Sequence, residues 1–170
     1  RILISHLSDI NFCNHENNKI NLINENIQNT KIKITGSTVY SSLKLTTKIK
    51  KNSNNFKNYI LLTLHRPENV DDVIKLKQIL DTIEKLENKV VFPIHPRTRK
   101  KLKSLKFENI ELIEPQNYFS FIDLMEKSIF IISDSGGVQE EAAVLRKPLI
   151  IPRDYTERPE MLGKFNLLAK

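Results

Sequence analysis

The sequence predicts an α/β fold, a Rossmann-like parallel sheet with helices on both faces. Apolar runs rich in β-branched residues alternate with segments of helical spacing along most of the 170-residue chain. These runs are continuously apolar, as in strands that are buried on both faces of a parallel sheet. Polar clusters follow the runs at their carboxyl ends, where ligands bind in such sheets. Right-handed crossovers between the strands then give a doubly wound arrangement.

The first part of the chain contains short elements. Ile10–Cys13 is predicted as a strand, the spacing from Leu22 to Ile27 is helical, and Ile32 and Ile34 alternate with lysines in a second short strand. Val39, Leu43 and Leu45 fit a further helix. The polar, low-complexity stretch 50–55 follows, and it predicts a junction between two domains, residues 1–50 and residues 51–170.

The second part of the chain carries the stronger strand signals. Tyr59–Leu64 predicts a buried strand, and Asp71 or Asp72 can cap a helix that follows it. The apolar face of that helix is predicted to consist of Val73, Leu76, Leu80 and Ile83. The remaining predicted elements are the strands Val90–Ile94, Ile110–Ile113, Ile129–Ile132 and Pro148–Ile151, and a helix around Phe121–Met125.

Composition excludes several classes of protein. The formal net charge is +7, but the lysines are scattered and aromatic residues make up only 7%, so the sequence does not predict a nucleic-acid partner. No apolar run is long enough to span a bilayer, so we expect no membrane partner. The single cysteine, Cys13, fits a reducing, cytoplasmic compartment. Cys13 and the histidines have no metal-binding spacing, so no metal is predicted.

The segment Ser133–Glu141 is the most informative one, because it joins the apolar run Ile129–Ile132 to a helix. Ser135, Gly136 and Gly137 would leave backbone N–H groups free at the helix start, where the helix dipole favours a phosphate. The paired carboxylates Glu140 and Glu141, one helical turn later, could accept hydrogen bonds from sugar hydroxyls. The alternative is a plain turn with an acidic first helical turn. Neither a Walker motif nor Gly-x-Gly-x-x-Gly is present.

His65 and Arg66 directly follow the strongest predicted strand. A histidine there can move a proton or stabilise a leaving diphosphate, and Arg66 can bind a phosphate or carboxylate through two parallel hydrogen bonds. The alternative is a structural turn, in which Pro67 forces Arg66 into an extended conformation. His95 repeats the pattern at the end of the next strand, where a structural role is the stronger alternative.

A dense charged loop follows the last predicted strand. Arg153, Glu157 and Arg158 interleave cations with a carboxylate near the predicted diphosphate site. Such a loop is solvated by default, but its position favours closure over a bound substrate.

Three long segments together resemble, in order and spacing, the non-hydrolysing UDP-N-acetylglucosamine 2-epimerases. They are Leu64–Asn69, Asp134–Glu141 and Arg153–Glu160, and three shorter segments also match: Thr35–Val39, Phe92–Pro96 and Ile113–Gln116. The resemblance covers essentially the whole chain. It implies a two-domain fold of the glycosyltransferase B type, with residues 1–50 ending the N-terminal domain and residues 51–170 forming an incomplete C-terminal UDP-binding domain.

The resemblance implies an activity and a site. Such enzymes interconvert UDP-N-acetylglucosamine and UDP-N-acetylmannosamine, without cofactor or metal, by eliminating UDP and adding it back, and their product feeds surface polysaccharide. The implied UDP site comprises Ser135, Gly136, Gly137 and Glu141, with Phe121 and Gln116 at the uracil. His65 and Arg1 match catalytic positions, and Arg66 and His95 match a second, regulatory UDP-sugar site in some bacterial members.

The resemblance also implies partners. They are UDP or UDP-N-acetylglucosamine, the N-terminal domain of the same parent chain, and a second copy in a homodimer. That domain supplies the catalytic carboxylates in the family, so we expect the isolated 170 residues not to catalyse epimerisation. The alternatives left open are a hydrolysing 2-epimerase, against which Asp134-Ser135-Gly136-Gly137 argues, a glycosyltransferase of the same fold, and a non-catalytic UDP-sugar-binding module.

Overall fold

The computed structural model describes residues 1–46, 55–102, 105–163 and 165–169. The chain divides into two compact units, Arg1–Lys48 and Ile49–Lys170, here called unit 1 and unit 2. The predicted junction at 50–55 lies, except for Asn55, outside the described residues. The assignment of the two parts to the end of one domain and to a second domain stays a prediction.

Unit 1 is built around a pair of short parallel strands. β1 (Asn11–Cys13) pairs with β2 (Ile32–Ile34), as the apolar runs predicted. The helical elements are α1 (Ile2–Leu7), α2 (Glu16–Asn24), the 3-10 turn η1 (Asn29–Lys31) and α3 (Thr38–Thr46). A small core contains Cys13, Leu22, Ile27 and Ile32.

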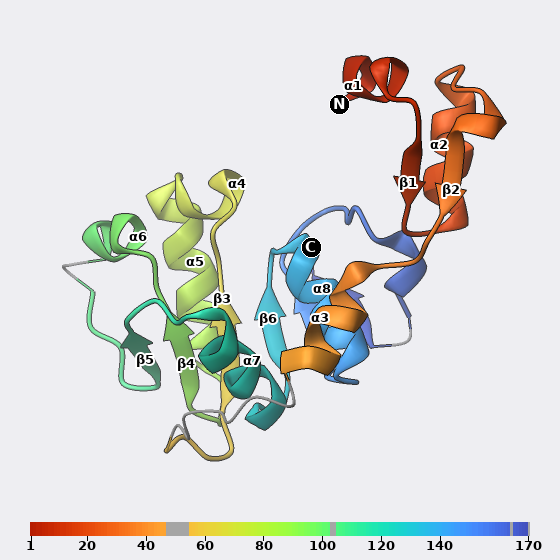
Figure 1. Ribbon diagram of the computed structural model, residues 1–170. Helices are drawn as coiled ribbons and strands as arrows, with labels where there is room; N and C mark the ends of the chain where they lie inside the picture. The colour runs from red at the N-terminus through yellow and green to blue at the C-terminus, as the bar shows by residue number, and fades with distance from the viewer. Residues whose placement is uncertain (47–54, 103–104, 164, 170) are drawn as a thin grey trace. The chain divides into compact units, whose positions relative to one another are not determined.

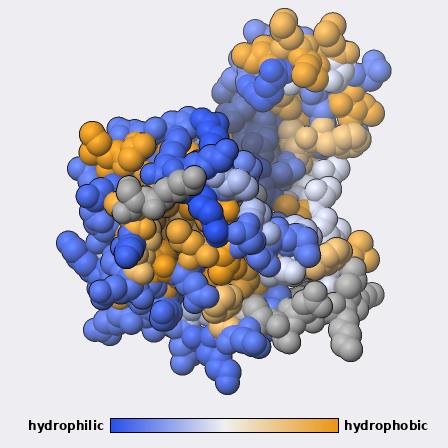
Figure 2. Space-filling view, turned by 90° about the vertical axis from the view of Figure 1, so that its left-hand side faces the viewer, coloured by the Kyte–Doolittle hydropathy of each residue, from blue (hydrophilic) through white to orange (hydrophobic). Residues whose placement is uncertain are grey.

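A two-stranded sheet cannot cover all the apolar side chains that unit 1 carries. In α1, which the sequence did not predict, Leu3 is 79% exposed and Leu7 is 85% exposed. Figure 2 shows these hydrophobic residues as orange surface on the smaller of the two bodies. An exposed apolar patch of this kind is typical of a surface that packs against further protein.

Unit 2 contains a parallel sheet of six strands with helices on both faces (Figure 1). The strand order is β5-β4-β3-β6-β7-β8, and each neighbouring pair is parallel. The strands are β3 (Ile60–Thr63), β4 (Val90–Pro93), β5 (Ile110–Ile113), β6 (Ile131–Ser133), β7 (Leu149–Ile151) and β8 (Asn166–Leu168). This confirms the predicted fold class.

The face of the sheet on which each helix lies follows from the direction in which the chain moves from one strand to the next. α5 (Val73–Ile83) and α6 (Pro96–Lys101) connect strands running outward to β5, α7 (Tyr118–Lys127) returns to β6, and α8 (Gly136–Val144) leads on to β7. Right-handed crossovers therefore place α5 and α6 on one face of the sheet and α7 and α8 on the other. The remaining elements are α4 (Pro67–Val70) and the 3-10 turn η2 (Pro159–Met161).

The core of unit 2 forms where α5 covers the sheet. Asp72, not Asp71, caps α5, with its carboxylate accepting from the amides of Ile74 at 2.8 Å and Lys75 at 3.2 Å. Leu76, Leu80 and Ile83 are buried against the strands, as predicted. Val73 was wrongly assigned to this face, because its side chain is 46% exposed while the buried residues of α5 are Leu76, Leu80 and Ile83.

Other differences from the prediction concern short elements. α4 and α6 were not predicted, and each begins at a proline that follows a strand-end basic or imidazole residue. Ile129 was predicted inside a strand, but β6 starts at Ile131 and Ile129 is 44% exposed. β8 adds an edge strand that the sequence did not indicate.

An apolar hollow of about 440 Å³ lies on the α5 face of the sheet. It is lined by side chains of α5, β6 and β7, including Ile79, Ile132 and Ile150. Of the predicted site residues, Arg153 lines it. Because the hollow offers little polar lining and lies away from the start of α8, we do not place a nucleotide there.

Within the described residues, no helix combines the length and the apolar character needed to cross a membrane.

Candidate functional site

The strand order contains a topological switch point between β3 and β6. From β3 the chain moves outward to β4 and β5 and then returns to β6, from which it continues to β7 on the other side. The loops that follow β3 and β6 therefore leave in opposite directions and open a crevice at their carboxyl ends, where ligands bind in open α/β sheets. These two loops carry His65-Arg66 and Asp134–Gly137.

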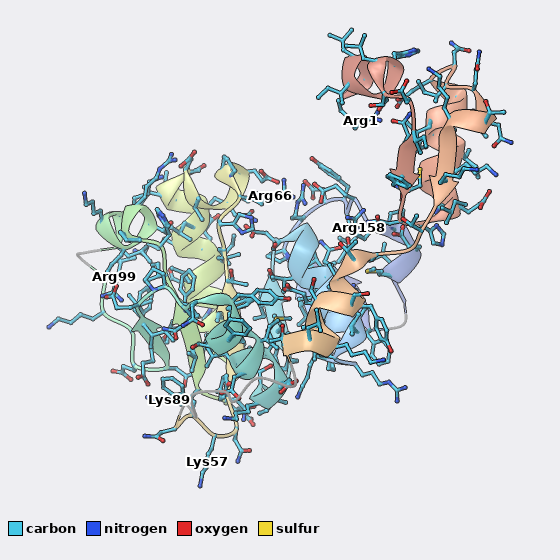
Figure 3. All side chains as sticks on the ribbon, viewed as in Figure 1. Arg1, Lys57, Arg66, Lys89, Arg99 and Arg158 are labelled. Atoms are coloured by element: carbon cyan, nitrogen blue, oxygen red, sulfur yellow. The ribbon has the colours of Figure 1, made fainter. Side chains whose placement is uncertain are left out.

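Figure 3 shows how basic side chains are distributed between the two ends of this sheet. The labelled Arg66 and Arg158 lie at one edge of unit 2, and the labelled Lys57 and Lys89, which precede β3 and β4, lie at the opposite edge. The residues at the carboxyl ends of β3, β6 and β7 that surround Arg66 and Arg158 are here called the edge cluster. It consists of His65, Arg66, Asp134, Ser135, Gly136, Arg153, Glu157 and Arg158.

Asp134 organises the loop after β3. Its carboxylate is fully buried and accepts hydrogen bonds from the backbone amides of His65 at 3.2 Å and Arg66 at 3.0 Å. The side-chain amide of Asn69 donates to it at 3.0 Å, and His65 Nδ1 lies 3.1 Å from Oδ1. Burial alone would raise the pKa of the Asp134 carboxyl, but the hydrogen bonds from His65, Asn69 and Arg66 outweigh it and lower that pKa.

We expect the stability of the fold to fall in acid because of Asp134. A carboxyl whose pKa is lower in the folded than in the unfolded chain stabilises the fold above the unfolded value of about 3.9, and this contribution is lost as pH falls through the folded value. Urea unfolding between about pH 5 and pH 2.5 should show this loss. In Asp134→Asn the acid dependence should be shallower, and an identical slope in both proteins would contradict the assignment.

The start of α8 is the predicted anion site. Ser135 caps the helix, with its hydroxyl oxygen accepting from the amide of Val138 at 3.5 Å, and its own amide donates to Ser133 Oγ at 3.1 Å. The first amides of the helix, from Gly136 onward, have no partner within the helix. A Cβ at Gly136 would lie 2.9 Å from Glu157 Oε2, so a larger residue at this position would push the end of the Glu157 side chain aside. Gly137 follows as an exposed residue of the first turn.

The loop after β7 contributes the remaining charges. Arg66 Nη2 pairs with Glu157 Oε1 at 2.9 Å, and Arg153 Nη1 lies 3.4 Å from the same oxygen. Arg153 is almost fully buried, its Nε lies 3.2 Å from Glu68, and it stacks on the ring of Tyr155. The Glu157 carboxylate thus lies beside the start of α8, held by two arginines that could each bind a phosphate.

Arg158 anchors the same loop to α8. Its Nη2 lies 2.5 Å from Glu140 Oε1, and the Glu140 side chain is only 6% exposed. Thr156 strengthens the attachment, because its hydroxyl lies 2.5 Å from Gln139 Oε1 and accepts from the amide of Arg158 at 3.0 Å. The predicted closing loop is therefore fastened to α8 at one end and faces Arg66 with Glu157.

Glu141, the predicted ribose ligand, is half-buried and hydrogen-bonded to Tyr118 at the start of α7. Burial raises the pKa of the Glu141 carboxyl, the hydrogen bond from Tyr118 partly opposes this, and the charge on Glu140 adds to the rise. Burial and the Glu141 charge in turn raise the pKa of the Tyr118 hydroxyl. The pair links the first turn of α7 to α8.

Other predicted site residues lie farther along the same edge or in unit 1. Gln116 is exposed in the loop after β5, with its side chain donating to the carbonyl of Glu114 at 2.7 Å, and Phe121 is half-buried in α7. His95 caps α6, its Nδ1 accepting from the amide of Arg97 at 3.3 Å. Arg1 belongs to unit 1, where it forms an ion pair with Glu25.

Sequence reasoning missed several residues that build this edge. Asp134 lies in one of the motifs but was assigned no role of its own, and Asn69 and Tyr118 were not predicted as site residues. A signal existed for Asp134, because a carboxylate directly after a buried strand must find donors there. Among the described residues, no group of three or more His, Cys, Asp or Glu side chains could hold a metal ion.

The fold and the edge cluster together define a class: an α/β domain with charged and glycine-containing loops gathered at the switch point of a parallel sheet. The comparisons with known proteins name the family. The sequence model of the family described as UDP-N-acetylglucosamine 2-epimerase matches residues 1–168, and the chain belongs to this family. The resemblance inferred from the motifs is confirmed.

Individual relatives agree with this membership. A UDP-N-acetylglucosamine 2-epimerase of Methanocaldococcus jannaschii is 39% identical, over 94% of this chain and 50% of the relative. Its crystal structure in complex with UDP-GlcNAc and UDP superposes with a TM-score of 0.83 at 37% identity, covering 99% of this chain and 52% of that one. The Neisseria meningitidis enzyme bound to UDP-GlcNAc gives a TM-score of 0.82 at 37% identity, with 96% of this chain and 49% of that one covered. The chain thus spans about half the length of the relatives it matches.

Proposed function

We propose that this chain is the part of a non-hydrolysing UDP-N-acetylglucosamine 2-epimerase that binds the UDP moiety of its substrate. The observation that carries the proposal is the start of α8, where Ser135 caps the helix and Gly136 and Gly137 present backbone amides at the switch point, next to Arg66. Amides at a helix N-terminus bind diphosphates without further machinery, because their partial charges and the helix dipole add. Relatives crystallised with UDP-GlcNAc or UDP support the choice of nucleotide.

The position of Glu157 suggests how binding proceeds. Its carboxylate lies 2.9 Å from the position that a Cβ of Gly136 would take and holds Arg66, so an incoming diphosphate competes with it for the same arginine and for the start of α8. Glu157 is 43% exposed and sits on the loop Arg153–Arg158. We infer that this loop moves when UDP binds and closes over it afterwards.

The remaining contacts of the nucleotide are assigned by position. Glu141, already oriented by Tyr118, would accept hydrogen bonds from the ribose hydroxyls. Gln116 and Phe121, on the loop before α7 and in its first turn, would contact the uracil. His65 and Arg66 would lie at the diphosphate, and the regulatory role of Arg66 and His95 stays a prediction.

In the complete reaction, UDP leaves as the C2 proton is removed and is added back after C2 has inverted. The contribution of unit 2 is to hold the departing UDP so that it can return, which favours the addition step through proximity and charge stabilisation. We assign the catalytic carboxylates to the part of the relatives that this chain does not span. The isolated chain should therefore bind UDP and show no epimerisation.

Further properties belong to the same proposal. The exposed apolar surface of α1 in unit 1 supports packing against the rest of an N-terminal domain, with Arg1 near its catalytic side. A free, buried Cys13 is compatible with a cytoplasmic protein. Assembly as a homodimer and a role in surface polysaccharide biosynthesis complete the proposed function.

The test is calorimetric titration of this chain with UDP. Ser135→Ala and Glu141→Ala should each weaken binding about tenfold, the equivalent of one lost hydrogen bond to a charged group. Asp72→Ala is the matched control, because it removes the cap of α5 at a stability cost of about 1 kcal/mol without touching the site. Absence of UDP binding, or equal affinity in all these variants, would refute the proposal.

A further inference from the structure

The buried carboxylate of Asp134 and the imidazole of His65 form a pair whose geometry is fixed by the sheet. β3 and β6 are adjacent and parallel, with Thr63 opposite Ser133. The residues that follow each strand therefore emerge side by side, and Asp134 meets the backbone of His65 and Arg66. A contact set by strand register is far more rigid than an ion pair between two surface side chains.

The Asp134 carboxylate is held in place by its burial and by several hydrogen-bond donors. Its side chain is completely buried, and a buried carboxylate is tolerated only with several hydrogen-bond donors. The backbone amides of His65 and Arg66 and the side chain of Asn69 provide these donors at 3.0–3.2 Å. Asn69 also donates to the carbonyl of Pro152, so the loop after β7 is tied to the same point.

His65 Nδ1 lies 3.1 Å from Asp134 Oδ1, and a hydrogen bond from the His65 side chain helps to lower the pKa of the Asp134 carboxyl, which indicates that this ring nitrogen carries the proton. An ionised carboxylate only accepts hydrogen bonds, so Nδ1 must be the donor. The neutral imidazole then has its lone pair on Nε2, and the side chain of His65 is 52% exposed. Nε2 is therefore the nitrogen that can take up or return a proton at the switch point.

We propose that Asp134 is a positioning residue that holds His65 in the Nδ1–H tautomer, so that Nε2 serves as the proton acceptor and donor beside the bound diphosphate. The inference rests on the proposed function for what His65 meets, but the tautomer itself is a property of this chain alone. Asp134 acts through His65 and needs no contact with the substrate.

The same chain supplies internal controls with the opposite tautomer. His95 and His15 each cap a helix, and each accepts a backbone hydrogen bond at Nδ1, from Arg97 at 3.3 Å and from Asn17 at 3.2 Å. A neutral ring that accepts at Nδ1 carries its proton on Nε2. In one spectrum, His65 should therefore differ from both His15 and His95.

The experiment is long-range proton–nitrogen NMR of the nitrogen-labelled chain at about pH 8.5, roughly two units above the ordinary imidazole pKa. His65, assigned from the signal lost in His65→Gln, should show a protonated Nδ1 and an unprotonated Nε2. His15 and His95 should show the reverse. A His65 signal that is predominantly Nε2–H in the unaltered chain overturns the proposal, and this result requires no variant to fold.

Two variants complete the test. Asp134→Asn places an amide that can donate next to Nδ1, so His65 should shift from predominantly Nδ1–H to predominantly Nε2–H, with His15 and His95 unchanged. Asp123→Asn alters another buried carboxylate, which is paired with Lys127 in α7, and should leave His65 as it was. An unaltered His65 tautomer in folded Asp134→Asn would also overturn the proposal.

UDP titration of the same samples separates this inference from the proposed function. A chain that binds UDP but lacks the Nδ1–H signature contradicts only the role of Asp134. A chain with the signature that does not bind UDP contradicts only the nucleotide site.

Discussion

Gly136→Ala should weaken the binding of UDP by about tenfold or more, the equivalent of about 1.4 kcal/mol. The added Cβ would lie 2.9 Å from Glu157 Oε2, and Arg66 Nη2 is only 3.9 Å away. The methyl group therefore narrows the space between the start of α8 and Glu157, through which a diphosphate must reach the amides of α8. Titration calorimetry with UDP measures the loss directly.

The free energy of unfolding of Gly136→Ala should not fall together with its affinity for UDP. Gly136 is the first residue of α8 and its φ is not positive, so alanine adopts its conformation readily and restricts the unfolded chain. Gly163→Ala is the matched control with the opposite pattern: its φ of +80° disfavours alanine, while nothing lies within 4 Å of the added Cβ. It should lose about 1 kcal/mol of stability and keep its affinity for UDP. Weakened UDP binding in Gly163→Ala with normal binding in Gly136→Ala would exclude our site.

The strands of unit 2 were predictable because of where they lie in the sheet. A central parallel strand is covered on both faces, so it reads as an uninterrupted apolar run, as in Ile60–Thr63 and Val90–Pro93. β8 (Asn166–Leu168) is an edge strand, its Leu167 is 64% exposed, and its sequence lacks such a run. The short helices α4 and α6 are too brief to show an apolar period, and their prolines indicated a turn equally well.

The sequence allowed us to predict which loops form the site, but not which side chains within them contact one another. Since every strand is parallel, the polar residues that follow β3, β6 and β7 had to share one edge, and this is where the structure places them. The contacts that these polar residues form could not be predicted from the sequence, because the contacts depend on which strands are neighbours in the sheet. Asp134 contacts the loop after β3 only because β6 lies next to β3, and Tyr118 reaches Glu141 only because α7 and α8 share a face.

Arg158→Ala should destabilise the protein by about 2–3 kcal/mol. The Glu140 side chain is only 6% exposed, so removal of the guanidinium 2.5 Å away takes a close ion pair from a buried carboxylate. The expected loss lies below that of a fully buried pair because Arg158 is 24% exposed. Urea unfolding at neutral pH provides the measurement.

The double variant Arg158→Ala/Glu140→Gln tests the cause of this loss. If the loss arises from the buried charge, replacement of the carboxylate by a neutral amide should restore most of the stability, and the two substitutions should be strongly non-additive. Arg97→Ala is the matched control, because Arg97 pairs with Asp71 at 2.7 Å but the two side chains are 69% and 41% exposed. It should cost less than about 1 kcal/mol. Equal losses from Arg158→Ala and Arg97→Ala would show that burial does not strengthen the pair that fastens the loop to α8.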